Sequence, residues 1–139
     1  MQIRFARYLA AAMLVLPAAG STTAAAAADS KCSQVNIQVK NQYHDPVTGA
    51  KVDIKVVDFS YWDKEDNKWR NEWTDNKRIN FGQTAVWTKN LEYVGGESGV
   101  KIKVTYKYDQ AGGGWSTDHT KTSTPFTCND QTVVPITID

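Results

Sequence analysis

The residue types best suited to binding chemistry lie in one short segment, from Phe59 to Trp73. It reads FSYWDKEDNKWRNEW and combines three tryptophans with carboxylates, amides and a guanidinium. Flat indole faces stack against the C–H faces of sugar rings, and polar side chains form directional hydrogen bonds to sugar hydroxyls. The segment is therefore a candidate carbohydrate-binding site. The candidate ligand-binding residues are Trp62, Trp69, Trp73, Arg70, Asn71 and Glu72.

The segment has the pattern of a β-hairpin with a polar tip. If Asp63 pairs with Lys68, then Trp62 lies opposite Trp69, and Ser60, Asn71 and Trp73 share their side of the hairpin. Phe59 and Tyr61 then point toward the core. A register displaced by one residue instead buries Trp69 and Trp73 and exposes Arg70 and Glu72. Both registers remain open on the sequence alone.

The oxygen-bearing residues of the hairpin tip also resemble a fragment of a calcium-binding loop. Asp63, Glu65 and Asn67 are weak candidate ligands, because hard cations take several oxygens from one short loop. However, Lys68 stands where such a loop needs its sharp-turn glycine, and Thr74 stands where it needs a bidentate glutamate. We therefore predict a solvated tip, no bound metal and no cofactor.

Catalytic arrangements are poorly represented, and we do not expect an enzyme. A two-carboxylate hydrolase needs one acid raised in pKa by burial, whereas the acids of this segment are flanked by Lys64 and Lys68. His44 lies in a turn beside an aspartate, and His119 follows Asp118 with no cysteine nearby. No His and Cys cluster has the spacing of a zinc site.

The composition after residue 28 predicts an all-β fold. It includes 12 valines, 6 isoleucines and 12 threonines but only one leucine, and branching at Cβ favours strands over helices. Residues 100–108 alternate apolar and polar side chains, as a half-buried strand does. Alternation changes parity near Val56 and Val57, which predicts a β-bulge. Strand number and turn spacing favour a single antiparallel β-sandwich of seven or eight strands.

This architecture resembles immunoglobulin and fibronectin type III modules, and a jelly-roll or transthyretin-like topology fits equally well. The spacing of Cys32 and Cys128 departs from the immunoglobulin pair, which joins two central strands, so no residue roles are carried over. We expect these two cysteines to form a structural disulfide in an oxidising compartment. The closed loop would stabilise the fold by about 4 to 5 kcal/mol in the chain-entropy description.

The N-terminus predicts export. Arg4 and Arg7 precede an apolar run that is too short to span a bilayer, and an alanine-rich stretch follows. We therefore expect a signal peptide at residues 1–28, a single domain at residues 29–139, a secreted or periplasmic location, and no stable membrane span. Removal of the signal leaves a formal charge of −1, so nucleic acid is not an expected partner.

Three classes of function follow from the sequence. The favoured one is a secreted, non-catalytic binding module for a carbohydrate or cell-envelope polymer. A second is a protein-binding or inhibitory sandwich that uses the loops 95–99 or 112–115. A third is a membrane-active secreted β protein, because tryptophan and tyrosine favour bilayer interfaces. Lys101, Lys103 and Lys107 form a basic stripe that would suit an anionic polymer, although outward lysines also serve to prevent aggregation.

Overall fold

The computed structural model describes residues 31–139, which form β-strands, turns and loops without a helix. The predicted signal peptide, residues 1–28, lies outside the described residues. The strands are β1 (Cys32–Asn41), β2 (Ile54–Asp63), β3 (Lys68–Glu72), β4 (Arg78–Ile79), β5 (Thr84–Leu91), β6 (Ser98–Val100), β7 (Ile102–Tyr108), β8 (His119–Thr122), β9 (Phe126–Thr127) and β10 (Val133–Ile138). The all-β prediction is therefore confirmed for this part of the chain.

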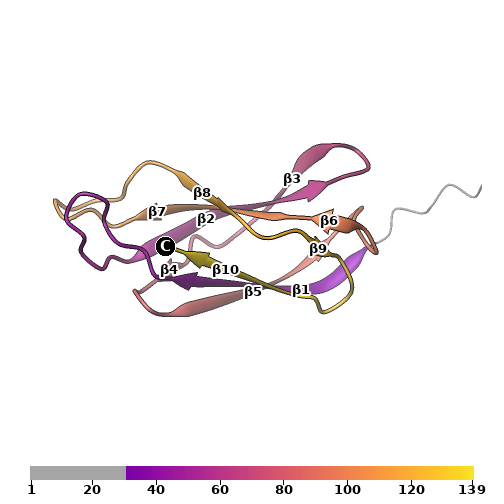
Figure 1. The fold of residues 1–139 in the computed structure, drawn as a ribbon, viewed down its shortest axis with the longest axis horizontal. Helices are drawn as coiled ribbons and strands as arrows, with labels where there is room; N and C mark the ends of the chain where they lie inside the picture. Colours follow the sequence, from indigo (N-terminus) through magenta and orange to yellow (C-terminus); the bar gives the residue numbers. More distant parts are fainter. Residues whose placement is uncertain (1–30) are drawn as a thin grey trace, which may run out of the picture.

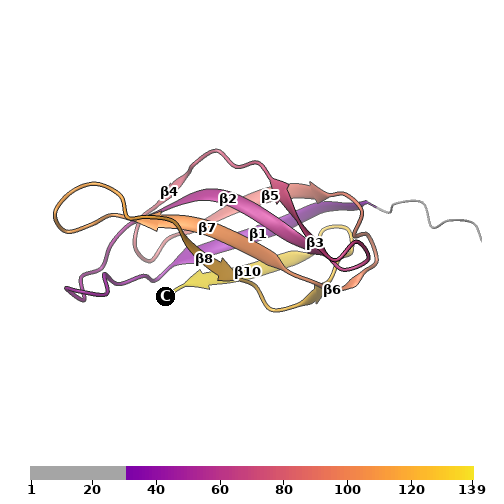
Figure 2. The same cartoon turned by 90° about the horizontal axis from the view of Figure 1, so that it is seen from above.

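The strands form two larger sheets and one small one. One sheet has the order β10-β1-β5, a second has the order β3-β2-β7-β8 with β4 also paired to β2, and β6 pairs with β9. Figure 1 shows β2, β7 and β8 in an upper layer and β1, β5 and β10 in a lower layer, and Figure 2 shows the upper layer from above. The described residues form ten strands rather than seven or eight, because β4, β6 and β9 are too short to show an alternating pattern.

One pairing differs from the antiparallel arrangement that the sequence predicts. β1 runs antiparallel to β5 but parallel to β10. Parallel neighbours need a long connection, and here β1 and β10 are the first and last strands of the described residues. Turn signals between adjacent segments predict hairpins, so they carry no information about this contact.

The hydrophobic core is built from both larger sheets. Val35, Ile37 and Val39 of β1 are buried, as are Phe59 and Tyr61 of β2. Residues that point inward alternate along each strand with residues that point outward, which is the period-2 pattern of a strand with one buried face. The inward direction of Phe59 and Tyr61 was predicted from the sequence and is confirmed.

A β-bulge changes the direction of side chains along β2. Val56 pairs with Tyr106 of β7, but the next pair is Asp58 with Thr105, so one residue of β2 has no partner. An extra residue in one strand reverses which face its neighbours occupy. The predicted bulge near Val56 and Val57 is therefore confirmed, and it brings Ser60 and Trp62 to the outward face.

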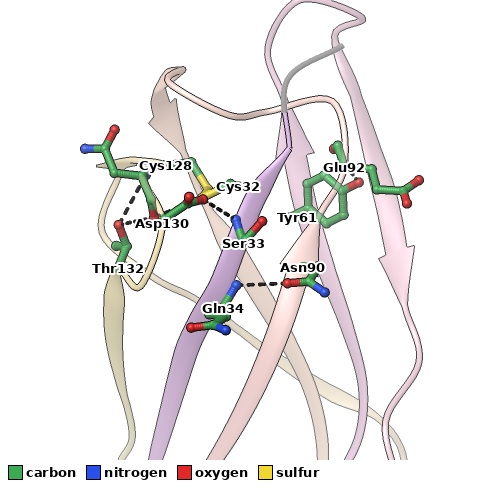
Figure 3. The surroundings of a disulfide bond; sticks show 10 residues. Cys32, Ser33, Gln34, Tyr61, Asn90, Glu92, Cys128, Asp130 and Thr132 are labelled. Carbon is green, nitrogen blue, oxygen red and sulfur yellow. Dashed lines mark hydrogen bonds between the residues drawn. A yellow bond between two sulfur atoms is a disulfide. The ribbon is translucent and has the colours of Figure 1, made fainter.

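A disulfide joins Cys32 of β1 to Cys128, which follows β9, with Cα atoms 5.8 Å apart. Both cysteines are fully buried. Figure 3 shows side chains of the neighbouring segments that fix the same end of β1: the Asp130 carboxylate accepts a hydrogen bond from the Ser33 amide, and Asn90 accepts one from the Gln34 amide. The predicted disulfide is confirmed, and such a bond is compatible with an oxidising compartment.

Candidate functional site

The β2–β3 hairpin has the register in which Asp63 pairs with Lys68. Trp62 lies opposite Trp69, and Tyr61 lies opposite Arg70. The tip turns through Asn67, whose φ of 52° is in the left-handed region that asparagine tolerates. The first register considered above is therefore confirmed, and the register that buries Trp69 is wrong.

Trp62 and Trp69 form a cross-strand pair on the outward side of this hairpin. Their ring centroids are 5.4 Å apart with an interplanar angle of 61°, which is an edge-to-face contact. Trp62 is half-buried, and 37% of Trp69 remains exposed. The contact holds both rings in place while part of the Trp69 surface stays open to solvent. The two rings therefore form an angled surface instead of a single flat platform.

Ser60 and Asn71 lie next to the tryptophan pair on the same side. Ser60 pairs with Asn71 across the strands, and its hydroxyl donates a 3.0 Å hydrogen bond to Asn71 Oδ1. The Asn71 side chain is exposed, and among the described residues its Nδ2 group donates no hydrogen bond. Two N–H donors are therefore held next to Trp69 at a defined position.

A lysine of the next strand completes this surface. Lys103 of β7 pairs with Ser60, and its ammonium lies 4.4 Å from the centroid of the Trp69 ring. Lys101 directly precedes β7, two residues before Lys103, and its carbonyl accepts a hydrogen bond from the Trp62 amide. The name tryptophan face is used below for the side of the sheet that carries Ser60, Trp62, Trp69, Asn71, Lys101 and Lys103, where Ser60 is buried beneath its neighbours.

Trp73 is more exposed than any other tryptophan but lies apart from the cross-strand pair. It follows the end of β3, and 79% of its surface is accessible. Its ring lies 5.8 Å from the ammonium of Lys89, which belongs to β5 in the other sheet, and Lys89 also donates to the Trp73 carbonyl. Trp73 therefore marks the edge between the two layers, beside the tryptophan face.

Arg70 lies on the opposite side of β3 from Trp69. Its Nε donates a 2.6 Å hydrogen bond to the buried Asp63 carboxylate, and its Nη2 lies 2.6 Å from Asp66. The guanidinium also stacks 3.9 Å from the centroid of the Tyr93 ring. The structure thus uses Arg70 to stabilise the hairpin tip, and Arg70 does not border the tryptophans as the sequence hypothesis supposed.

Glu72 also points away from the tryptophan face. It pairs with Phe59 and is half-buried. Burial raises the pKa of Glu72, and the charge of Glu92 acts in the same direction while Lys89 opposes both. The expected role of Glu72 as a sugar contact beside Trp69 is therefore corrected, because alternation along β3 puts the two side chains on opposite sides.

The weak calcium candidates do not assemble into a site. Asp63 uses one oxygen for Arg70 and the other for the Asp66 amide, at 2.6 and 3.0 Å. Burial acts to raise the pKa of Asp63, but these hydrogen bonds outweigh it and the pKa is lowered. Within residues 31–139 no three His, Cys, Asp or Glu side chains group closely enough to hold a metal ion.

The histidines are used in packing. The His44 ring lies 5.1 Å from Phe81, and the His119 ring lies 5.2 Å from Tyr108. Asp118 faces Lys107 at 3.5 Å, so among the contacts of the described residues it does not orient the His119 imidazole. This arrangement differs from a catalytic dyad, in which the carboxylate would hold the ring.

A shallow depression lies near the other end of the molecule. It has a volume of about 540 Å³ and is lined by residues 50–53 and by Asp109, Gln110, Ala111 and Gly113. In Figure 1 these loops occupy the left end, whereas the tip of the β2–β3 hairpin is at the right. Its two carboxylates, Asp53 and Asp109, are both paired with Arg78. The depression is therefore separate from the tryptophan face.

The sequence hypothesis missed the contribution of Lys101 and Lys103 to the tryptophan face. The lysine stripe and the tryptophan hairpin were both recognised, but about 30 residues separate them in the chain. The β2–β7 register alone brings them together.

Comparison with known proteins gives no relative from which a function can be transferred. No family model matches the chain, and no curated protein or solved structure matches it significantly. Residues 31–139 contain no helix with the length and apolar character needed to cross a membrane. The function must therefore be inferred from the geometry of the surface itself.

Proposed function

We propose that this protein is a secreted, non-catalytic binding module that recognises a carbohydrate or cell-envelope polymer through the tryptophan face. The observation that carries the proposal is the outward Trp62–Trp69 pair with Asn71 beside it. An exposed indole face and a fixed amide donor are the two features that a sugar ring needs for stacking and for hydrogen bonding. In this proposal the two larger sheets are the layers of a β-sandwich that presents the face.

The surroundings of the face support a binding role over a catalytic one. Of the hairpin carboxylates, Asp63 is buried and ion-paired with Arg70, Glu72 lies on the other side of β3, and Asp58 lies on the same side of β2 as Ser60, opposite Thr105. The hairpin is also held rigidly, since it pairs with β7 along most of β2 and is stabilised at its tip by Arg70. A rigid surface loses little conformational entropy on binding.

Secretion is part of the proposal and has its own support. The buried Cys32–Cys128 disulfide is typical of oxidising compartments, and the N-terminal sequence has the order of charged, apolar and small residues that export signals share. An exported module would meet polysaccharides and cell walls outside the cytoplasm. N-terminal sequencing of protein recovered from the culture medium or periplasm tests this part, and a mature N-terminus near Asp29 is expected.

Depletion by insoluble polysaccharides tests the binding function. Protein expressed from the full chain is mixed with cellulose, chitin, xylan and cell-wall preparations, and the fraction left in solution is measured. We expect one or more of these polymers to deplete the wild type, and Trp69→Ala to reduce the binding at least tenfold. Val86→Ala is the matched control, because Val86 is an exposed apolar residue on the other sheet.

The variant must remain folded for the result to count. Trp69 is partly exposed at the edge of its sheet, so its truncation removes the contact with Trp62 without opening the core. Far-UV circular dichroism and thermal melting verify the fold. If folded Trp69→Ala binds as well as the wild type, the tryptophan face is not the binding surface. If no polymer depletes the wild type, the carbohydrate proposal fails.

A further inference from the structure

Two lysines on the tryptophan face carry charge that no carboxylate neutralises. Within residues 31–139 the cations of the ion pairs are Lys68, Arg70, Arg78, Lys107 and Lys121. Lys101 and Lys103 form none of these pairs, and the short contact of Lys103 is with the Trp69 ring. Lys103 therefore brings a positive charge without a carboxylate partner to the ring of Trp69.

The acid closest in register does not remove this charge. Asp58 lies on the same side of β2, opposite Thr105, which places it diagonally from Lys103. Diagonal neighbours on a sheet are about 7 to 8 Å apart, and Asp58 forms no ion pair with a described residue. At the far end of β7, Lys107 pairs with Asp118, whereas Lys55, which lies opposite Lys107 on β2, forms no ion pair within residues 31–139 and has its ammonium over the Trp115 ring.

Protection against aggregation does not explain the position of these lysines. Outward lysines serve that purpose on edge strands, where unpaired backbone groups would recruit another strand. β7 is an internal strand, because β2 lies on one side of it and β8 on the other. Its backbone is paired on both sides at Lys103, with Ser60 of β2 and Thr122 of β8, so Lys103 has no edge to protect.

From this arrangement we infer that the polymer bound by the tryptophan face is an anionic polysaccharide, whose acidic groups pair with Lys101 and Lys103 while a sugar ring stacks on Trp69. The inference rests on the proposed function and specifies its ligand. Adjacent strands are about 4.8 Å apart, and residues two apart in an extended chain, as Lys101 and Lys103 are, lie about 6.6 Å apart. One chain of linked sugar rings would cover both Trp69 and the two lysines.

The polar centre of the face favours a polysaccharide over an anionic lipid surface. In register, Ser60 lies between Asn71 and Lys103, beside the tryptophan pair, and the exposed Asn71 offers amide donors that suit hydroxyl groups. A membrane-docking surface needs contiguous apolar side chains that enter the acyl region, with the cations around them. Here the apolar area is one angled indole pair.

Isothermal titration calorimetry with soluble polymers tests the inference. The full-chain protein is titrated in calcium-free buffer with alginate, which carries carboxylates, with heparin, which carries sulfates, and with neutral dextran and soluble xylan. We expect binding to an anionic polymer at 50 mM salt that weakens several-fold at 500 mM, since screening acts on exposed charges. Lys103→Gln should weaken this binding about threefold to fivefold, and Lys101→Gln together with Lys103→Gln about tenfold.

A control variant tests whether the lysines of the tryptophan face, rather than the net charge of the protein, determine binding. Lys40→Gln removes the same charge from the exposed surface of β1 in the other sheet, and it should leave binding unchanged. If Lys40→Gln weakens binding as much as Lys103→Gln, the effect is one of net charge and the inference is wrong. Melting temperatures within two degrees of the wild type, roughly the effect of half a kcal/mol, are required of all three variants.

The remaining outcomes distinguish this inference from the proposed function. If the protein binds only neutral polymers, and Trp69→Ala abolishes this binding while Lys103→Gln does not affect it, the anionic ligand is wrong and the carbohydrate module stands. If it binds phosphatidylglycerol vesicles but none of the polysaccharides, both are wrong and the face docks on membranes. Salt-dependent binding to alginate or heparin that needs Trp69 and Lys103 supports the carbohydrate-binding function and the anionic ligand.

Discussion

The Asp63–Arg70 ion pair should be the main polar stabiliser of the β2–β3 hairpin, and Asp63→Asn tests this. Asp63 is 1% exposed, and Arg70 Nε lies 2.6 Å from its Oδ2 atom. An asparagine keeps an oxygen for the Asp66 amide but loses the charge that pairs with the guanidinium. Arg70 keeps its contacts with Asp66 and Tyr93, so the loss should be smaller than for a fully buried pair.

We expect Asp63→Asn to lower the free energy of unfolding by about 2 kcal/mol, the usual contribution of a charged hydrogen bond. For a domain of about 110 residues this corresponds to a melting temperature lower by roughly 8 °C. Urea unfolding at pH 7, followed by tryptophan fluorescence and by circular dichroism, measures the difference. Asp66→Asn is the control: Asp66 contacts the same guanidinium at 2.6 Å but is 53% exposed, and its loss should cost about 0.5 kcal/mol.

The pH dependence gives an independent test of the same pair. Burial acts to raise the pKa of Asp63, but the Asp66 amide and Arg70 outweigh it and hold the pKa below 3.8. The unfolded state therefore binds more protons as the pH falls below about 4, and the stabilisation present above that pH is lost as the pH passes the folded pKa. The difference between wild type and Asp63→Asn should be constant from pH 5 to 8 and should shrink below pH 4. Equal stability of the two proteins at pH 7, or a difference that persists unchanged at pH 2, would refute the reasoning.

Three further predictions concern the core, the tyrosines and the exposed indole. Replacing Cys32 and Cys128 together by alanine should lower the free energy of unfolding by about 4 kcal/mol, because the disulfide joins residues 96 positions apart. Urea unfolding of the double variant measures this loss, and an unchanged unfolding midpoint would contradict the prediction. Burial raises the pKa of Tyr61 and of Tyr106 to about 12 from the usual 10. The unfolded state therefore releases these protons at lower pH than the folded state, and the free energy of unfolding should fall as the pH rises from 10 to 12. An absorbance titration in which all tyrosines of the folded protein ionise near pH 10 would be inconsistent with the structure. Acrylamide should quench the wild type more strongly than Trp73→Phe, since Trp73 is 79% exposed, and identical quenching would place that ring in a shielded site.

Local sequence patterns predicted local structure well. The polar tip between two aromatic segments predicted the hairpin but left two registers open, and the structure decided between them; the bulge followed from the change of parity at Val56 and Val57. Both features depend on residues that are neighbours in the chain, where alternation reports the face of each side chain directly. The disulfide required only two cysteines and an oxidising compartment.

Alternation was also sufficient to exclude Arg70 and Glu72 from the tryptophan face. Both residues are an odd number of positions from Trp69, so the register that exposes Trp69 must turn them to the other side of β3. Residue type alone had favoured them, because guanidinium and carboxylate groups bind sugars well. Strand geometry takes precedence over chemical suitability when the two disagree.

Contacts between distant strands were beyond the reach of sequence patterns. The parallel pairing of β1 with β10 and the two-residue strands β4 and β9 leave no periodic signal. The same limit hid the contact of Lys103 with Trp69, since alternation gives the face of each residue but not which strand lies beside it. Strand order is set by the packing of the whole core, to which every strand contributes.

The formal charge of residues 29–139 is a poor guide to the sign of the proposed ligand. A value of −1 makes long-range attraction to a polyanion weak, and this argues against nucleic acid. At physiological salt, however, exposed charges act over only about 8 Å, so a ligand responds to the groups it touches and not to the total. Asp53, Asp63, Asp66, Asp109, Asp118 and Asp139 are engaged in ion pairs. Among these pairs none involves Lys101 or Lys103, so a ligand that stacks on Trp69 would meet the ammonium of Lys103 without a carboxylate partner.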